Sequence, residues 1–452
     1  MHRMRTGAAL LVGSTLMLAA CSSSSSGGSG ASTATSASTA TSASTAVSTP
    51  ATSEAAKPVT LTWWHNATAD PLKGYFDAVA AAYTKLHPNV KFKIVPVQNE
   101  TIQTKITVAL QSNNPPDIFQ QWGGGDLATQ VKTGKVQDLT TASADTIKAI
   151  GGQGAGWTVD GKQYGLPYSV GIVGFWYRPD LFTKAGITAP PTTMAELVAD
   201  VGKLKAAGIT PIAVGGKDKW PDAFYWGYFA VRECSQETIQ AATKNIDFTD
   251  PCFLKAGQDT QALLASKPFQ AGFLGTSAQQ GAGSSAGLVA NGKAAMELQG
   301  HWNSGVIGGL TPDKKPLGSD KLSWFGVPAA AGGAGAPDAS FGGGDGFSCS
   351  VNAPPECADF LNFLLNAENQ KTFAATGAGL PVNPDAESAV TDATLKNVLA
   401  FRDKSSFVEL YFDKALPTAV GTALNNEVAN LFAGQSSPAK IVAAVAKAKA
   451  QQ

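Results

Sequence analysis

Apolar and polar positions after residue 58 alternate between the period of a strand and the period of a helix. Strands are expected at 59–64 and 91–97, and a third is expected to begin at Asp117. Between them, apolar residues recur at helical spacing over 72–86 and 102–110. This order of elements requires parallel pairing with right-handed crossovers, so it predicts a layered α/β lobe.

The same kind of pattern begins again further along the chain. Strands are expected at 174–177, 209–214, 322–327 and 340–349, a helix at 194–207, and an Ala-rich helical tail at 407–452. We therefore expect two α/β lobes, each a layered, mostly parallel sheet with flanking helices, and more than one crossing of the chain between them.

The first 20 residues have the features of a secretory signal. A basic start at residues 1–5 precedes an apolar stretch, 7–20, that is shorter than the roughly 20 residues needed to span a bilayer. The stretch ends in Leu-Ala-Ala-Cys21, which is similar to the lipobox of bacterial lipoproteins. That resemblance implies removal of 1–20 and a lipid on Cys21, which would anchor the protein to the extracytoplasmic face of the cell membrane. The alternative is an ordinary signal beside an unrelated cysteine.

Residues 22–57 are almost wholly Ser, Thr, Ala and Gly. Such a segment cannot bury enough apolar surface to offset the entropy lost on ordering, so it predicts a disordered tether. Its 36 residues would hold the folded part about 30–36 Å from the lipid.

The charge of the chain narrows the class of ligand. Lys plus Arg and Asp plus Glu number 34 each, so the net charge is zero. A nucleic acid would select a basic surface, so this balance argues against such a partner. With 9 Trp, 21 Phe and 8 Tyr, the composition favours a neutral, partly apolar ligand.

Four cysteines other than Cys21 remain, and an even number in an exported chain predicts disulfides. Three pairings are possible. Proximity in the sequence favours Cys234–Cys252 and Cys349–Cys357, each closing a loop worth roughly 3 kcal/mol. Neither a CxxC pair nor clustered histidines occur, so no metal site or cofactor is expected.

Several motifs resemble the carbohydrate-binding proteins of ABC importers, the extracellular solute-binding family that includes the maltose-binding type. They occur in family order at 116–119, 165–182, 291–302, 325–328 and 342–347. The resemblance covers essentially all of 58–452, although Arg178-Pro179 stands where the family usually has Asn-Lys. Within the family, the stretch 220–226 and the Gly-rich turn 342–346 are most similar to the actinobacterial xylobiose and xylo-oligosaccharide group.

The resemblance implies a monomeric, hinge-bending binder that holds a neutral oligosaccharide between two lobes and delivers it to the transmembrane subunits of an ABC permease. It also implies a division of the folded part: first lobe 58–168, second lobe 169–328, first lobe again 329–395, and second lobe again 396–452.

Sugars present apolar C–H faces and a rim of hydroxyl groups, so their sites need aromatic plates and polar partners. Trp302 matches the stacking Trp of the family, and one of Trp220 and Trp226 is expected to stack. Asp345 lies among glycines, where a backbone can approach a ligand closely. The remaining candidates follow strands or precede the last helices: His65, Asn66, Gln121, Trp122, Tyr411 and Asp413.

Each candidate also has a purely structural interpretation. A Trp is often buried in a core, a lone His is more often structural, and an Asp among glycines can stabilise a turn. Two functional alternatives also remain. One is a glycosidase, for which two of Asp222, Glu233 and Asp345 would have to flank the scissile bond. The other is a sugar sensor that works without a transporter. We expect a binding protein with no catalytic residues.

Overall fold

The computed structural model describes residues 57–112 and 114–452. The larger of its two main sheets holds six strands. The expected signal, tether and lipid-bearing Cys21 lie outside these residues. The strand order is β12-β11-β3-β1-β2, with β6 also paired to β11. The strands are β1 (Val59–His65), β2 (Val90–Pro96), β3 (Ile118–Gln121), β6 (Leu166–Ile172), β11 (Ser340–Cys349) and β12 (Val408–Leu410).

Pairing in this sheet confirms the expected crossovers near the N-terminus. Strand β1 lies parallel to both β2 and β3, as the strand–helix–strand order requires. Strand β11 pairs antiparallel with β3 and β6 and parallel with β12. The larger sheet is therefore mostly parallel.

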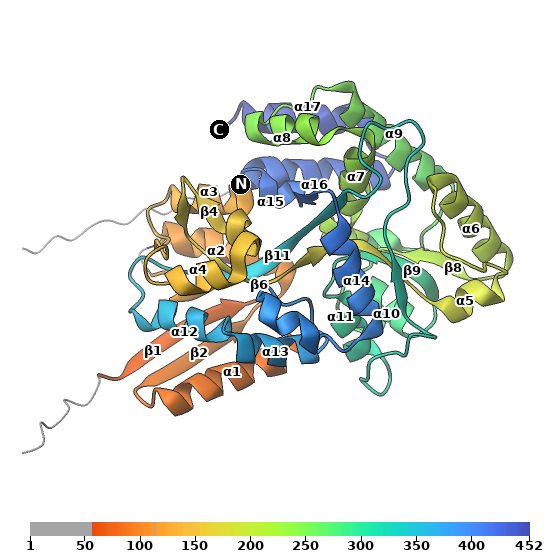
Figure 1. The fold of residues 1–452 in the computed structure, drawn as a ribbon. Coiled ribbons are helices and arrows are strands. Elements are labelled where there is room, and N and C mark those ends of the chain that lie inside the picture. Colours follow the sequence, from red (N-terminus) through yellow and green to blue (C-terminus); the bar gives the residue numbers. More distant parts are fainter. Residues whose placement is uncertain (1–56, 113) are drawn as a thin grey trace, which may run out of the picture. The chain divides into compact units, whose positions relative to one another are not determined.

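Successive side chains along these strands point into different cores. Trp63 and Ile118 belong to the core under α1 (Leu72–Leu86) and α12 (Glu356–Leu364), whereas Trp64 and Phe119 face the core under α2 (Asn99–Gln111) and α3 (Gly124–Val131). This alternation follows from the two-residue period of a strand, and it explains why both faces carry helices. Figure 1 shows these helices around the larger sheet. We call this sheet and its helices the first lobe.

The smaller sheet has four strands in the order β10-β7-β9-β8, and it forms the second lobe with its helices. Only β8 and β9 are parallel; the other two pairings are antiparallel. The expectation of a mostly parallel sheet is therefore wrong for this lobe. Strand β7 pairs antiparallel with both β9 and β10, and the strand–helix pattern did not reveal these pairings. The strands are β7 (Gly174–Tyr177), β8 (Thr210–Ala213), β9 (Ala294–Gln299) and β10 (Ser323–Phe325).

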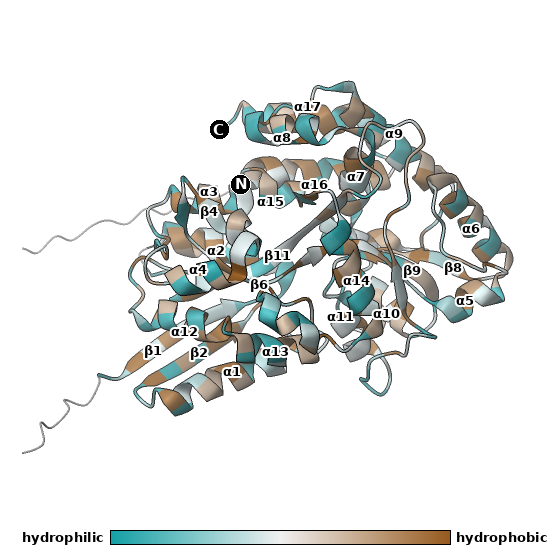
Figure 2. Ribbon diagram, viewed as in Figure 1, coloured by the Kyte–Doolittle hydropathy of each residue, from teal (hydrophilic) through white to brown (hydrophobic). Residues whose placement is uncertain are grey.

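Helices cover the smaller sheet on both faces. Phe175 joins a core with α6 (Met194–Ala206), α7 (Trp220–Glu233) and α16 (Thr418–Phe432), and its neighbour Trp176 joins another with α10 (Ser285–Ala290), α11 (Asn303–Leu310) and α14 (Ala393–Lys404). Hydrophobic and hydrophilic residues alternate around α6, as expected of a helix with one face on a core (Figure 2).

The shorter elements complete the two lobes. The remaining helices are α4 (Ala144–Ile150), α5 (Pro179–Lys184), α8 (Gln236–Asn245), α9 (Pro251–Ala265), α13 (Ala367–Ala375), α15 (Phe412–Ala415) and α17 (Pro438–Lys449). Short 3-10 helices occupy Gly151–Trp157, Gly216–Asp218, Phe273–Gly275 and Pro384–Ala389, and a hairpin joins β4 (Thr158–Val159) to β5 (Lys162–Gln163). Within the described ranges, no helix is both long and apolar enough to cross a membrane.

The chain passes between the sheets at several points. Val173 alone separates β6 from β7, and residues 326–339 lead from β10 back to β11. The proposed lobe limits at 168/169 and 395/396 fall inside β6 and inside α14. Our division of the chain into alternating lobe segments stays a prediction.

The C-terminal tail differs from expectation at its start. Residues 408–410 form β12, which adds to the edge of the larger sheet beside Ser340–Gly342. Three residues carry too short a pattern to distinguish a strand from a helix, and a partner distant in sequence decides the outcome. The helical tail therefore begins only at Phe412.

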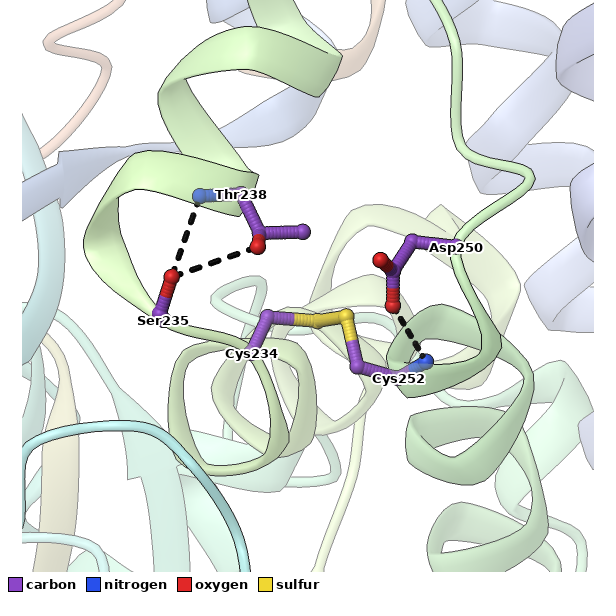
Figure 3. Close-up of a disulfide and its surroundings, with 5 residues drawn as sticks. All are labelled: Cys234, Ser235, Thr238, Asp250 and Cys252. Atoms are coloured by element: carbon purple, nitrogen blue, oxygen red, sulfur yellow. Dashed lines mark hydrogen bonds between the residues drawn. A yellow bond between two sulfur atoms is a disulfide. The ribbon is translucent and has the colours of Figure 1, made fainter.

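Both disulfides favoured by proximity are formed. Cys234 and Cys252 join the end of α7 to the start of α9, with their Cα atoms 5.2 Å apart (Figure 3). Cys349 and Cys357 join the end of β11 to α12, with a Cα separation of 6.2 Å.

Replacing both cysteines of a pair by serine tests these links without leaving a free thiol. The Cys234→Ser/Cys252→Ser double variant should lose about 3 kcal/mol of unfolding free energy, because its unfolded chain regains the freedom of a loop of 18 residues. The Cys349→Ser/Cys357→Ser variant, with a separation of 8, should lose about 2.5 kcal/mol. Urea denaturation measures both, and unchanged midpoints would contradict the prediction.

Candidate functional site

A cavity of about 550 Å³ lies where strands of both sheets end. Asn66 and Trp122 line it directly after β1 and β3, and Trp302 lines it after β9. Open α/β sheets bind ligands outside the carboxyl ends of their strands, and the volume is typical of sites for small molecules. We call this cavity the cleft and treat it as the candidate site.

One wall of the cleft is aromatic. The Trp220 ring lies 6.4 Å from the Trp302 ring, which lies 6.3 Å from the Tyr411 ring. Phe224 stacks on Tyr411 with ring centroids 5.2 Å apart. All four line the cleft, so the wall offers broad apolar plates to a ligand.

Glycines hold two of these rings in place. A Cβ on Gly300 would lie 2.2 Å from the Trp302 ring, and one on Gly343 would lie 2.6 Å from the Tyr411 ring. Any side chain at either position would push its ring away from the backbone and into the cleft. The two glycines therefore set the depth of the aromatic wall.

Polar atoms on the same wall are buried without partners. Within the described residues, Trp220 Nε1, Trp302 Nε1, Tyr411 Oη and Asn425 Oδ1 make no hydrogen bond with the protein. Buried polar groups are rarely left unpaired in native proteins. A ligand that carries several hydroxyl groups would supply both donors and acceptors to them.

Asp345 supplies a carboxylate from the first lobe. Its Oδ1 accepts a hydrogen bond from Gln120 Nε2 at 2.8 Å and a longer one from Asn66 Nδ2 at 3.5 Å. Burial raises the pKa of Asp345 to about 6, although hydrogen bonds from Trp122, Asn66 and Gln120 and the charge of Lys414 act to lower it. At neutral pH the carboxylate is charged and accepts hydrogen bonds strongly.

Lys414 is a cleft residue that the sequence did not indicate. Its ammonium lies 4.6 Å above the Trp122 ring, donates to Gln103 Oε1 at 2.8 Å, and is 3.6 Å from Asp413. It belongs to α15, a helix of four residues whose position depends on packing between distant segments. Only its closeness in sequence to Tyr411 and Asp413 could have suggested it.

Acidic residues outnumber basic ones around the cleft. Three lysines, Lys217, Lys219 and Lys414, line it together with five acidic residues, which are Asp70, Glu100, Asp218, Asp345 and Asp413. A site for a phosphate or another anion would need an excess of basic groups, so this lining argues against an anionic ligand. In the described part of the chain, no three His, Cys, Asp or Glu side chains meet as a metal site would require.

Residues 69–371 match the family of bacterial extracellular solute-binding proteins, and that range holds 303 of the 452 residues. The chain belongs to this family. The solute-binding protein is 25% identical over 383 residues, 82% of each chain, to an uncharacterized ABC transporter extracellular-binding protein of Pyrococcus horikoshii. It is also 30% identical over 150 residues, 31% of this chain and 33% of the relative, to the diacetylchitobiose binding protein DasA of Streptomyces coelicolor.

Solved structures confirm the two-lobe α/β fold. One, described under xylan utilization by Caldanaerobius polysaccharolyticus, has a TM-score of 0.78 at 27% identity and covers 85% of this chain and 98% of its own. A chitin oligosaccharide binding protein has a TM-score of 0.77 at 24% identity, with 87% and 98% coverage. At 24% identity the second likeness supports the fold alone.

The structure brings seven of the ten expected ligand contacts to the cleft of the solute-binding protein. These are Asn66, Trp122, Trp220, Trp302, Asp345, Tyr411 and Asp413. They come from both lobes and from segments more than 340 residues apart in sequence. Their role as ligand contacts stays a prediction.

The other three do not line the cleft, which corrects the expectation for each. His65 is buried against Phe76, with ring centroids 4.9 Å apart, and burial lowers its pKa to about 4. Gln121 Oε1 accepts from the backbone N–H groups of Trp122 and Gly123 and so shapes the turn after β3. Trp226 is fully buried, 5.4 Å from the Phe412 ring.

The carboxylates considered for a glycosidase are not brought together. Of the three, only Asp345 lines the cleft. Asp222 is buried within α7, and Glu233 lies at the far end of that helix near Lys255 and Asp259. The two-carboxylate arrangement of a glycosidase is not made by these residues.

The ionisation of Asp345 can be tested through its neighbour Trp122. Tryptophan fluorescence should show a transition near pH 6, and Gln120→Met should move it upward, because the lost hydrogen bond stabilised the charged form. A ligand that donates hydrogen bonds to this carboxylate should bind less tightly as the pH drops below about 6.

The Asp345→Asn variant is the control and should remove the contribution of Asp345 to both effects. Burial also raises the pKa of Asp218, at the same cleft, to about 6. A transition that is the same in Asp345→Asn as in the unsubstituted chain would therefore belong to Asp218 and would contradict the prediction for Asp345.

Proposed function

We propose that this solute-binding protein captures a neutral oligosaccharide between its lobes and delivers it to an ABC permease, without chemistry of its own. One observation carries the proposal: an aromatic wall with unpartnered polar atoms and the carboxylate of Asp345 line the same cleft. Aromatic plates suit the C–H faces of a sugar, and the polar groups suit its hydroxyl rim.

The distribution of the contacts over two lobes supports capture by closure. Asp345 and Asn66 belong to the first lobe, whereas Trp302 and Trp220 follow or begin elements of the second. A ligand that touches both sets stabilises the arrangement in which they face each other. The closed form is then the one that a permease would recognise.

The names of several relatives point to oligosaccharides. They include a diacetylchitobiose binding protein and the melibiose/raffinose/stachyose-binding protein MelE of Bacillus subtilis, which is 26% identical over 187 residues. The structure described under xylan utilization is 27% identical. We propose xylobiose or a short xylo-oligosaccharide as the ligand.

We further propose that the protein works as a monomer held at the extracytoplasmic face of the membrane by a lipid on Cys21. The Ser/Thr/Ala-rich segment 22–57 would act as a tether. Tethering keeps captured ligand near the permease and raises its effective concentration there.

Titration calorimetry of the full chain against xylobiose, cellobiose, chitobiose and maltose tests the ligand class. We expect at least one to bind with micromolar or tighter affinity, xylobiose most tightly, and we expect no cleavage products by chromatography. A chain that binds none of the four contradicts the proposal. Turnover above background would instead favour the glycosidase.

A different measurement distinguishes this function from that of a sugar sensor that works without a transporter. The loaded protein should stimulate ATP hydrolysis by its reconstituted permease, whereas the empty protein should not. Tight sugar binding without any such stimulation would favour the sensor.

Trp302→Ala should weaken sugar binding by about 2–4 kcal/mol, as removal of an aromatic anchor does, with little change in melting temperature. Trp226→Phe is the matched control, since this Trp lies in the core and away from the cleft. It should keep full affinity and melt at a lower temperature. Unchanged affinity with a collapsed melting temperature in Trp302→Ala would show that Trp302 is a core residue.

A further inference from the structure

Helix α7 runs from the cleft to the segments that join the two lobes. Trp220 and Phe224 in its first two turns line the cleft. Every residue from Pro221 to Glu233 is buried. With 14 residues it spans about 21 Å, so it is a rigid rod through the interior.

The middle of α7 is hydrogen-bonded to Val173, the residue that joins β6 of the larger sheet to β7 of the smaller one. We call Val173 the first crossing. Tyr228 Oη donates a hydrogen bond to the Val173 carbonyl oxygen at 2.5 Å, and the Val173 N–H donates to the Phe341 carbonyl at 2.8 Å. Phe341 is the second residue of β11, the strand that follows residues 326–339. The N–H and C=O groups of Val173 therefore both make hydrogen bonds, and the C=O group is bonded to a side chain of α7.

The end of α7 is hydrogen-bonded to residues 326–339, which lead from β10 of the smaller sheet back to β11 of the larger one. We call this segment the second crossing. The Arg232 guanidinium is buried and donates to Val327 O at 2.9 Å and Ala339 O at 2.6 Å, with longer bonds to Pro328 O and Ala336 O. One planar group thus binds both ends of the loop. A lysine has a single nitrogen in place of three and cannot reproduce this fork of donors.

The second crossing also returns hydrogen bonds to the helix. Ala334 N–H donates to Glu233 O at 3.1 Å and Gly335 N–H to Arg232 O at 3.0 Å, which caps the last turn of α7. A Cβ on Gly335 would lie 2.1 Å from Val231 O, so this approach excludes any other residue there. The Cys234–Cys252 disulfide of Figure 3 follows at once and secures the same end.

Close packing fixes the helix against the strand that follows the second crossing. A Cβ on Gly227 would lie 2.6 Å from the Phe341 ring, and the Tyr228 and Phe341 rings are 5.7 Å apart. A shift of α7 would therefore move Phe341 and, with it, the start of β11. Packed interiors transmit such displacements rather than absorb them.

We propose that α7 couples ligand contact to lobe closure, with Tyr228 and Arg232 as the positioning residues that hold two of the segments joining the lobes. The inference rests on the proposed function, because it assumes that a ligand touching Trp220 and Phe224 is held by closure. Neither positioning residue lines the cleft. They act by setting how often the lobes adopt the binding arrangement.

Electron–electron distance measurements between spin labels on the two lobes test the proposal. Thr101→Cys and Ala282→Cys place labels at exposed sites beside the 3.0 Å hydrogen bond from Gln280 to Glu100 at the cleft mouth. Cys21→Ser in every variant leaves these two thiols as the labelled pair. Tyr228→Phe and Arg232→Lys should each broaden the ligand-free distribution and weaken sugar affinity about tenfold, as expected when the binding arrangement is populated a tenth as often.

Two controls separate this role from a general loss of stability. Tyr225→Phe removes a buried hydroxyl from the same helix, and Arg178→Lys alters a buried guanidinium that binds Asp180 and Val289 O. Both should keep the distance distribution of the unsubstituted chain even where they lower the melting temperature. Distributions of Tyr228→Phe and Arg232→Lys that match these controls would overturn the proposal.

The outcome is separable from that of the proposed function. If the unsubstituted chain binds no sugar of the panel, the proposed function fails, and the ligand-free distributions still decide the role of α7. If it binds and closes while Tyr228→Phe and Arg232→Lys close identically with equal affinity, the role of α7 fails and the proposed function stands.

Discussion

The larger sheet is built around strand β11, which pairs closely with three neighbouring strands. A Cβ on Gly342 or on Gly344 would lie 2.3 Å from a backbone oxygen of β6, and one on Gly346 would lie 2.5 Å from another. Side chains are therefore excluded along this run, apart from Asp345. The same strand reaches β12 at its start, β3 at its end, and a disulfide at Cys349.

This pairing brings the carboxylate of Asp345 to the cleft that the aromatic wall also lines. Asp345 reaches the cleft because its flanking glycines let β11 lie close to the crossing strand β6, and because the register shifts between Asp345 and Gly346. Tyr411 packs onto Gly343 of the same run. One strand thus sets the position of a hydrogen-bond acceptor and of an aromatic plate, while Trp302 and Trp220 approach from the second lobe.

Much of the first lobe could be predicted because its local pattern and its tertiary pairing agree. The period of residues 59–64 and 72–86 corresponds to β1 and α1 within a residue or two at either end. Agreement failed where the local pattern was short: residues 408–410 became a strand only through pairing with β11. The strand order of the smaller sheet could not be predicted either. Its antiparallel strands are joined by long helical segments, and the sequence pattern does not show how such strands pair.

The candidate site divides in the same way. Positions directly after β1 and β3 could be singled out, but which side chain turns inward depends on the face to which it points: His65 is buried in the first lobe and Asn66 reaches the cleft. Trp226 and Trp220 look equivalent in sequence. They are six residues apart on α7 and so point about 240° apart around its axis, which puts one in the core and the other at the cleft.

Residue types and short-range spacing were enough to indicate the family, the neutral charge balance, the alternation of strands and helices, and the glycines without which β11 could not pair so closely. None of these needs contacts between distant segments. The folded chain was needed to see which rings line the cleft, that Lys414 lies over Trp122, and that Arg232 binds both ends of a crossing. Those contacts join residues about 95 to 290 positions apart, and no local pattern encodes them, because they exist only once both sheets have formed.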